Sequence, residues 1–251
     1  LCLFSSLIVY FDQKLVFAPL LILLLLLNLR IEITFKIYTI ILFFIFSLPY
    51  FYLIYLWGSL IPPSANLARE VGSSIHLFHP GYCLTILMLT IFPFIFLNNE
   101  NIDSLKNKIL NKKFIYILIL FLFYSLLVVY FGDFENLKID GKGAIHKLLL
   151  ILIEDANIRL VFTLVSFFFS LIFTYLIFDN KIDLLIITYF MVLSIFTFPF
   201  YQEYLDPLFY ILIFSFFKSK FKFENKKNVF FLVLYFLILS LSSKYYYQIS
   251  I

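Results

Sequence analysis

Three short segments hold most of the side chains that could do chemistry in an otherwise apolar chain. The first contains Arg69 and Glu70, the second contains His76 and His79, and the third covers residues 202–206. An arginine guanidinium is a permanently charged, planar fork that matches phosphate oxygens. A carboxylate can take the proton of a hydroxyl group that is about to attack. This set of side chains therefore predicts binding of a phosphate and activation of a hydroxyl.

The densest polar cluster is formed by Gln202, Glu203, Tyr204 and Asp206, directly before Pro207. Ionisable groups beside membrane-embedded segments are costly and are functional hypotheses by default. We interpret Glu203 as a candidate general base, and the other three as groups that orient a sugar through hydrogen bonds. The alternative is a tight polar turn without a chemical role.

His76 and His79 lie three residues apart at the start of an apolar run, so they can share one face of a helix. A metal site needs at least a third ligand, and none is near in sequence. We therefore expect no metal and no organic cofactor, and treat both histidines as substrate-binding candidates or as structural residues of the interface. Arg69 is the candidate phosphate ligand and Glu70 a second candidate base, unless they form a solvated pair.

The composition sets the class of protein. The chain has 251 residues, of which 63% are hydrophobic and 14% charged, and Phe alone occurs 36 times. A soluble domain carries about 25% charged residues, because its surface faces water. An ordinary soluble globule, a disordered chain and a nucleic-acid-binding domain are therefore excluded.

The apolar runs predict an all-α, polytopic bundle of about eight or nine transmembrane helices. A helix needs about 20 apolar residues to cross the bilayer, and these runs are continuously apolar, unlike the alternating strands of a barrel. The first run begins at residue 1 without a Met, so we expect residues 1–251 to be one transmembrane domain, the C-terminal part of a longer protein. The nine predicted spans are residues 1–10, 15–29, 37–57, 76–97, 114–131, 158–178, 184–200, 204–217 and 229–241.

The loop charges predict the orientation. Alternate loops divide the charges unequally, with 12 of the 19 cations and 6 of the 15 acids on one side. Cytoplasmic loops are rich in Lys and Arg, so the other side is predicted to be exterior. Pro49, Pro93 and Pro199 fall within spans, where neighbouring groups must satisfy the carbonyls that they leave without a donor.

Three loops on the predicted exterior side are polar and irregular, namely residues 57–75, 132–157 and 201–207. The second contains a DGKG turn that lacks the frame of a phosphate loop. It continues into an apolar run at residues 144–153, which is too short to span and is expected to lie in the outer interface. Few charges fall inside the spans, which counts against an ion-coupled pump or a voltage sensor.

The stretch 57–93 has a Trp-Gly pair at the exterior end of a span, a polar loop, and a histidine that leads into an aromatic span. This pattern resembles multi-spanning glycosyltransferases of the GT-C architecture, which use polyprenyl-phosphate sugars. Within that group it is similar to the dolichyl-phosphate-glucose-dependent alpha-1,2-glucosyltransferases. The matching positions are Trp57, Gly58, His76 and Tyr82.

Two elements of that family differ in this chain. Residues 62–64 read Pro-Pro-Ser where the family has a Gly-Asp-Lys element, and residues 202–204 read Gln-Glu-Tyr where it has Arg-His-Tyr. The resemblance implies that a sugar moves from a polyprenyl-phosphate donor to a glycan or lipid acceptor on the exterior or lumenal side. Catalytic candidates are Glu203 and Glu70; substrate-binding candidates are Trp57, Arg69, His76, His79, Gln202, Tyr204 and Asp206.

The resemblance also implies a multi-pass protein of the bacterial inner membrane or the endoplasmic reticulum, with membrane lipid, the lipid-linked donor and the acceptor as partners and no nucleic acid. Three alternatives stay open. A transporter or flippase subunit would show internal repeats and broken helices. A polysaccharide polymerase or ligase of the cell envelope would carry an arginine-rich exterior loop, and a structural membrane subunit would leave the polar turns without partners.

Overall fold

The computed structural model describes residues 23, 26, 32–58, 75–96, 112–132, 142–178, 180–196, 202–213, 217, 230–239 and 241. The chain divides into two compact units, Leu1–Ile75 with Phe196–Pro199, and His76–Ile195 with Phe200–Ile251. Every regular element in the described ranges is helical, which confirms the all-α prediction for this part of the chain.

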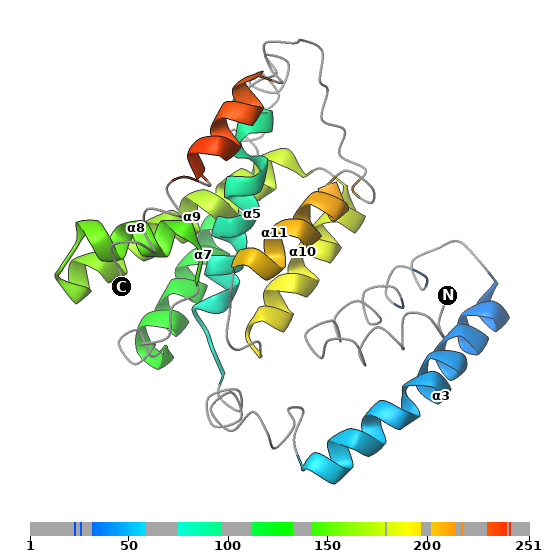
Figure 1. The fold of residues 1–251 in the computed structure, drawn as a ribbon. Helices are drawn as coiled ribbons and strands as arrows, with labels where there is room; N and C mark the ends of the chain where they lie inside the picture. The colour runs from blue at the N-terminus through cyan, green and yellow to red at the C-terminus, as the bar shows by residue number, and fades with distance from the viewer. Residues whose placement is uncertain are drawn as a thin grey trace. The chain divides into compact units, whose positions relative to one another are not determined.

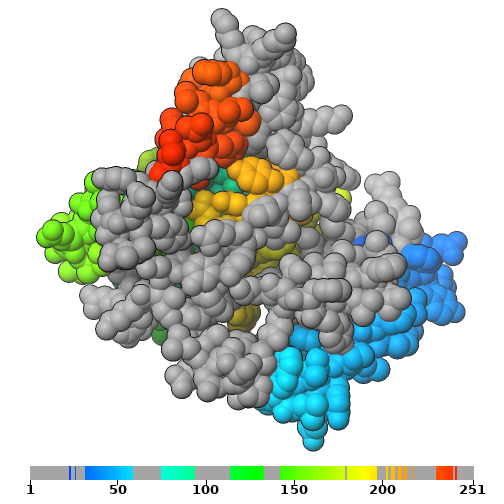
Figure 2. Space-filling view, in the orientation of Figure 1, coloured from blue at the N-terminus to red at the C-terminus, as the bar shows by residue number. Residues whose placement is uncertain are grey.

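The first unit contributes one long described helix, α3 (Ile33–Trp57). Most of its apolar side chains are exposed, and Figure 2 shows them on the surface in blue and cyan. The helix ends at Gly58, whose φ of 64° is left-handed and whose N–H donates to the Tyr55 carbonyl. Glycine adopts this conformation without a Cβ penalty, so the Trp-Gly pair marks the end of the helix.

The second unit is built around one central helix, α5 (His79–Phe96). Helices α8, α9, α10 and α11 pack against α5, and α7 packs against α9 (Figure 1). The bounds are Lys112–Phe131 for α7, Ala144–Leu152 for α8, Ala156–Ile177 for α9, Lys181–Ser194 for α10 and Gln202–Ile211 for α11. A further helix covers residues 230–239.

Helices α5 and α9 approach closely because small residues line the crossing. A Cβ on Gly81 would overlap the ring of Phe167, so only glycine fits at that position. The α9 face toward the protein carries Thr163, Ser170 and Thr174, all buried, and each hydroxyl donates to a carbonyl one turn earlier in α9. Small and hydroxylated residues at helix contacts are typical of membrane bundles, where close backbone packing replaces the hydrophobic effect.

Side-chain caps set the starts of α9 and α10. Asp155 Oδ1 accepts from the N–H groups of Asn157 and Ile158, at 2.8 and 2.9 Å. Asn180 Oδ1 accepts from the N–H of Ile182 at 2.9 Å. Because these caps satisfy first-turn donors, α9 begins at Ala156 and α10 at Lys181, slightly before the predicted spans 158–178 and 184–200.

Three described helices are long and apolar enough to cross a membrane: α3, α7 from Phe114 to Phe131, and α9. Two shorter apolar helices cover His79–Pro93 and Phe230–Leu239. The α10 and α11 helices, of 14 and 10 residues, are shorter than the roughly 20 residues that a single span needs. Helix length and composition thus fit a membrane protein, and the number of eight to nine spans stays a prediction.

Candidate functional site

His76 and His79 form a stacked pair at the start of α5. Their rings lie 4.6 Å apart, centroid to centroid, with an angle of 16° between the planes. The N–H of His76 donates to the Ile195 carbonyl at 2.9 Å, and both side chains are buried. The two rings therefore lie side by side, but α5 begins at His79, so His76 precedes the helix and the pair does not share a helix face.

His79 has a defined tautomer. Its Nδ1 lies 3.1 Å from the Ser194 carbonyl oxygen, and a carbonyl oxygen can only accept a hydrogen bond. Nδ1 must therefore carry a hydrogen, and in the neutral ring Nε2 is then an acceptor. This bond links the first turn of α5 to the end of α10.

Helix α8 begins well inside the bundle. A Cβ on Gly143 would lie 3.0 Å from Cγ1 of Ile86, so residue 143 touches α5 at that level. Ile86 follows His79 by seven residues, which is about 10 Å along a helix. With nine residues α8 is too short to span a bilayer, as predicted for this apolar run, and its place in the outer interface stays a prediction.

The turn before α8 adopts strained backbone angles. Lys142 has a φ of 51° and Gly143 a φ of 90°, both in the region that favours glycine. For a lysine this costs free energy, and the surrounding structure must hold it in place. Lys142 is only 4% exposed, and its Nζ lies 6.0 Å from the centroid of the Tyr82 ring. A buried cation is thus fixed beside the start of α8.

Gln202 joins α11 to the start of α8. Its Oε1 accepts from the N–H of Ala144 at 2.7 Å, and its Nε2 donates to Asp206 Oδ2 at 3.0 Å. The first N–H groups of a helix have no partner within the helix, so Gln202 acts as a remote cap. Asp206 lies one turn after Gln202 on the same face of α11.

Tyr82 and His146 share a hydrogen bond of 3.1 Å between the Tyr82 hydroxyl and His146 Nδ1. Burial, with the positive charges of Lys142, Arg159 and Lys147, lowers the pKa of His146 to about 3. The imidazole is therefore neutral at physiological pH and serves as a hydrogen-bonding group, not as a cation.

The predicted site residues divide into those that the structure brings together and those that it does not. The described pairs are His76 with His79 and Gln202 with Asp206, and both pairs belong to the second unit. Trp57 ends α3 in the first unit. Glu203 and Tyr204 are described as backbone positions in the first turn of α11, and Arg69 and Glu70 lie outside the described residues.

The sequence candidates did not include Lys142 or His146. The signal was present in the DGKG turn followed by a short apolar run with one histidine. The contact of Gly143 with Ile86 places this turn against α5, and no local sequence pattern encodes that contact. Within the described ranges, no group of three His, Cys, Asp or Glu side chains is placed to hold a metal ion.

The arrangement offers hydrogen-bond donors and acceptors, a buried cation and a carboxylate within a bundle of apolar helices. Such a setting can hold an anionic, hydroxyl-bearing group next to a proton acceptor. Comparison of the chain with protein-family models, with curated proteins and with solved structures finds no match.

Proposed function

We propose that this chain contributes to a multi-pass membrane glycosyltransferase that moves a sugar from a polyprenyl-phosphate donor to an acceptor hydroxyl. The observation that carries the proposal is the remote cap from Gln202 to Ala144. It connects the polar face of α11, with Asp206, to the turn that holds buried Lys142. Polar and charged groups inside an apolar bundle are costly and are kept where they act.

The cations near α8 favour an anionic group. Lys142, Lys147 and Arg159 all act on His146 electrostatically, so they lie near one another around the start of α8 and α9. A phosphate bound near them would be stabilised by charge-assisted hydrogen bonds. The neutral His146 and the amide of Gln202 supply hydrogen bonds suited to sugar hydroxyls without adding charge.

The proposed reaction is a displacement at the anomeric carbon. A carboxylate, with Glu203 or Glu70 in this role, takes the proton of the acceptor hydroxyl. The acceptor oxygen forms a bond to the anomeric carbon while the bond from that carbon to the phosphate oxygen breaks. The lipid phosphate leaves with the bonding electron pair, and the cations stabilise its charge.

A transfer assay tests the proposal. Membranes containing the full chain would receive polyprenyl-phosphate hexoses labelled in the sugar, and labelled product would be extracted and counted. We expect Glu203→Gln or Glu70→Gln to lower transfer by about 100-fold, the lower range for a lost general base. The control is Glu154→Gln, which changes an exposed carboxylate between α8 and α9. Equal transfer by wild type and both test variants would contradict the assignment.

One observation favours a second function, lipid or solute translocation. Transporters place short or broken helices with their ends inside the bundle, and α8 begins beside Ile86 of α5. A flippase would move a fluorescent polyprenyl-phosphate sugar across vesicles containing the chain, and no new glycosidic bond would form. This outcome separates the two functions.

A further inference from the structure

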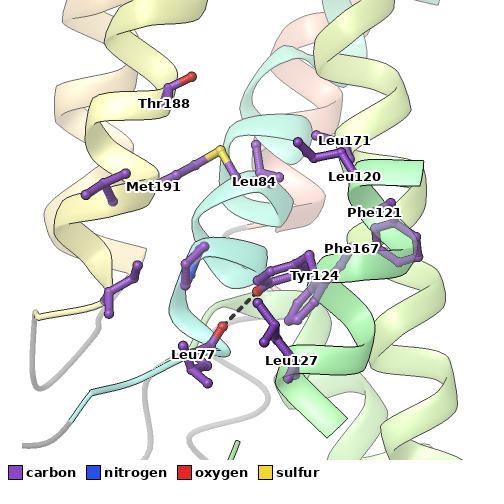
Figure 3. A pocket seen from close by; sticks show the side chains of 14 residues that line it. Leu77, Leu84, Leu120, Phe121, Tyr124, Leu127, Phe167, Leu171, Thr188 and Met191 are labelled. Atoms are coloured by element: carbon purple, nitrogen blue, oxygen red, sulfur yellow. Dashed lines mark hydrogen bonds between the residues drawn. The ribbon is translucent and has the colours of Figure 1, made fainter. Parts of the chain in front are cut away.

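A cavity of about 270 Å³ lies beside α5, between α7 and α10 (Figure 3). Leu84 of α5 forms its inner wall, Leu120 and Leu127 of α7 one side, and Met191 and Val192 of α10 the other. Phe167 of α9 closes it from behind. All these residues belong to the second unit.

The cavity offers almost nothing to water. Its two hydroxyl-bearing side chains are Tyr124 and Thr188. The Tyr124 hydroxyl donates to the Leu77 carbonyl at 2.8 Å, drawn as a dashed line in Figure 3, and accepts from the Gly81 N–H at 3.1 Å. The Thr188 hydroxyl donates to the Leu184 carbonyl at 2.8 Å. A buried water needs two to four polar partners, so these walls favour hydrocarbon.

The mouth of the cavity is continuous with the apolar surface of α7. Leu120 is 61% exposed and Val192 51% exposed, although both line the cavity. Leu120 belongs to the part of α7 that is long and apolar enough to cross a membrane. In a bilayer the opening therefore faces lipid chains.

Position along α7 sets the depth. The lining residues of α7 run from Leu120 to Val128, which is about 12 Å along the helix and ends one turn before Phe131. A leaflet contributes about half of the roughly 30 Å hydrocarbon core. The cavity thus occupies the depth of one leaflet, the one at the Phe131 end of α7.

The size fits part of one chain. An engineered apolar cavity of about 150 Å³ in another protein stays dry and binds benzene, and this cavity is nearly twice as large. A void of this size forfeits dispersion contacts on every wall, and a flexible hydrocarbon chain restores them. A polar ligand would gain little, because the two hydroxyl groups of the lining already donate to backbone carbonyls.

We infer that this cavity binds one acyl chain of a bilayer phospholipid from the leaflet at the Phe131 end of α7. The chain enters between α7 and α10 and lies against Leu84 of α5. The inference rests on the lining and the mouth of the cavity, so it holds whether or not the protein transfers sugar.

Photochemical labelling tests the inference. The full chain would be purified from membranes in detergent to remove loosely held lipid. It would then be incubated with a phosphatidylcholine that carries a diazirine in one acyl chain, irradiated, digested and mapped by mass spectrometry. We expect label on Leu84, whose side chain is 4% exposed, and on Met191, whose side chain is half-buried.

Two variants fill the mouth from opposite sides, Leu120→Trp on α7 and Val192→Phe on α10. Each should lower labelling of Leu84 by about tenfold, equivalent to about 1.4 kcal/mol of lost binding. The matched control is Leu126→Phe, an α7 position that is 69% exposed and does not line the cavity. Thermal unfolding of each variant identifies any that fails to fold. One folded filling variant is enough for the test.

Three results would overturn the inference. Label on Leu84 that persists in both folded filling variants would place the probe elsewhere. No label on Leu84 in the wild type would show that the acyl chain does not enter the cavity. Label from a diazirine-bearing polyprenyl phosphate and none from the phospholipid would replace the assigned occupant. Loss of sugar transfer in Glu203→Gln with unchanged labelling would concern the proposed reaction alone.

Discussion

Tyr235 donates its hydroxyl hydrogen to the Leu89 carbonyl of α5 at 2.9 Å. In a regular helix that carbonyl would accept from the N–H of residue 93, but residue 93 is proline and has no N–H. The hydroxyl of a distant helix thus replaces the missing backbone donor. An unpaired carbonyl within an apolar bundle is costly, so this bond permits Pro93 inside α5.

Removing that hydroxyl should destabilise the protein. We expect Tyr235→Phe to lower the free energy of unfolding by about 1 kcal/mol, in the range measured for hydrogen bonds between membrane helices. In a Pro93→Ala background residue 93 has its own N–H, so the same change should cost less. Thermal unfolding of the four proteins in detergent measures the coupling, and Tyr130→Phe, at a position 83% exposed, is the control. If Tyr235→Phe lowers the stability equally in the wild type and in Pro93→Ala, the Tyr235 hydroxyl does not compensate for the donor that Pro93 lacks.

The bundle class could be predicted from the sequence because composition and continuous apolar runs depend on local chemistry. The prolines illustrate this: a requirement for a neighbouring donor at Pro93 was predictable, whereas its identity as Tyr235 was not, since the partner is 142 residues away from Pro93 in the chain. Helix starts also shifted where caps decide them, as at Asp155 and Asn180. The burial of Asp183 within the first turn of α10 differs from its predicted place in a loop.

The candidate site was predictable where neighbours in sequence are neighbours on a helix. Gln202 with Asp206 follows from a spacing of four residues within α11, whereas His76 precedes α5, so its stacking on His79 does not come from helical spacing. The contact of Gln202 with Ala144 joins residues 58 apart and depends on how α11 and α8 pack around α5. Periodicity carries no information on such packing, so Lys142 and His146 were not among the candidates.

A methyl group at Gly81 should disrupt the contact between α5 and α9. A Cβ there would overlap the Phe167 ring, so we expect Gly81→Ala to cost about 1–3 kcal/mol, the usual range for overpacking. Phe167→Leu removes part of the obstructing ring and leaves a cavity of its own. Chemical unfolding should give a smaller cost for the double variant than for the sum of the singles. If the stability losses of the two single variants simply add in the double variant, the predicted clash between a residue 81 Cβ and the Phe167 ring is contradicted.

Loss of the Gln202 amide should weaken the start of α8. Gln202→Leu removes the acceptor for the Ala144 N–H, and we expect a loss of about 1 kcal/mol in stability, as for a missing helix cap. Gln202→Glu keeps an acceptor but places a second carboxylate beside Asp206. Hydrogen exchange of the Ala144 amide separates the lost acceptor from the added charge. We expect faster exchange in Gln202→Leu and continued protection in Gln202→Glu. Asn157→Ala, at an exposed position, is the stability control.

His146 should make stability depend on pH. Its pKa is lowered from 6.5 to about 3 in the folded protein, first by burial and then by Lys142, Arg159 and Lys147. Between these two values the unfolded chain binds a proton that the folded chain does not, so acid favours unfolding. His146 therefore contributes a loss of stability as the pH falls from about 6.5 towards 3, with a slope of at most about 1.4 kcal/mol per pH unit.

The unfolding temperature of the wild type and of His146→Gln, measured from pH 7 to pH 4 in one detergent, checks this sign. Glutamine has no proton to gain, and its amide can still meet the Tyr82 hydroxyl. The variant should therefore lose less stability than the wild type on acidification, so if the amide costs little at neutral pH the two curves start together and separate as the pH falls. A wild-type curve no steeper than that of the variant would mean that folding does not lower the pKa of His146. Below about pH 6.5 the ring would then be a further cation beside Lys142, and its neutral hydrogen-bonding role at that pH would be wrong.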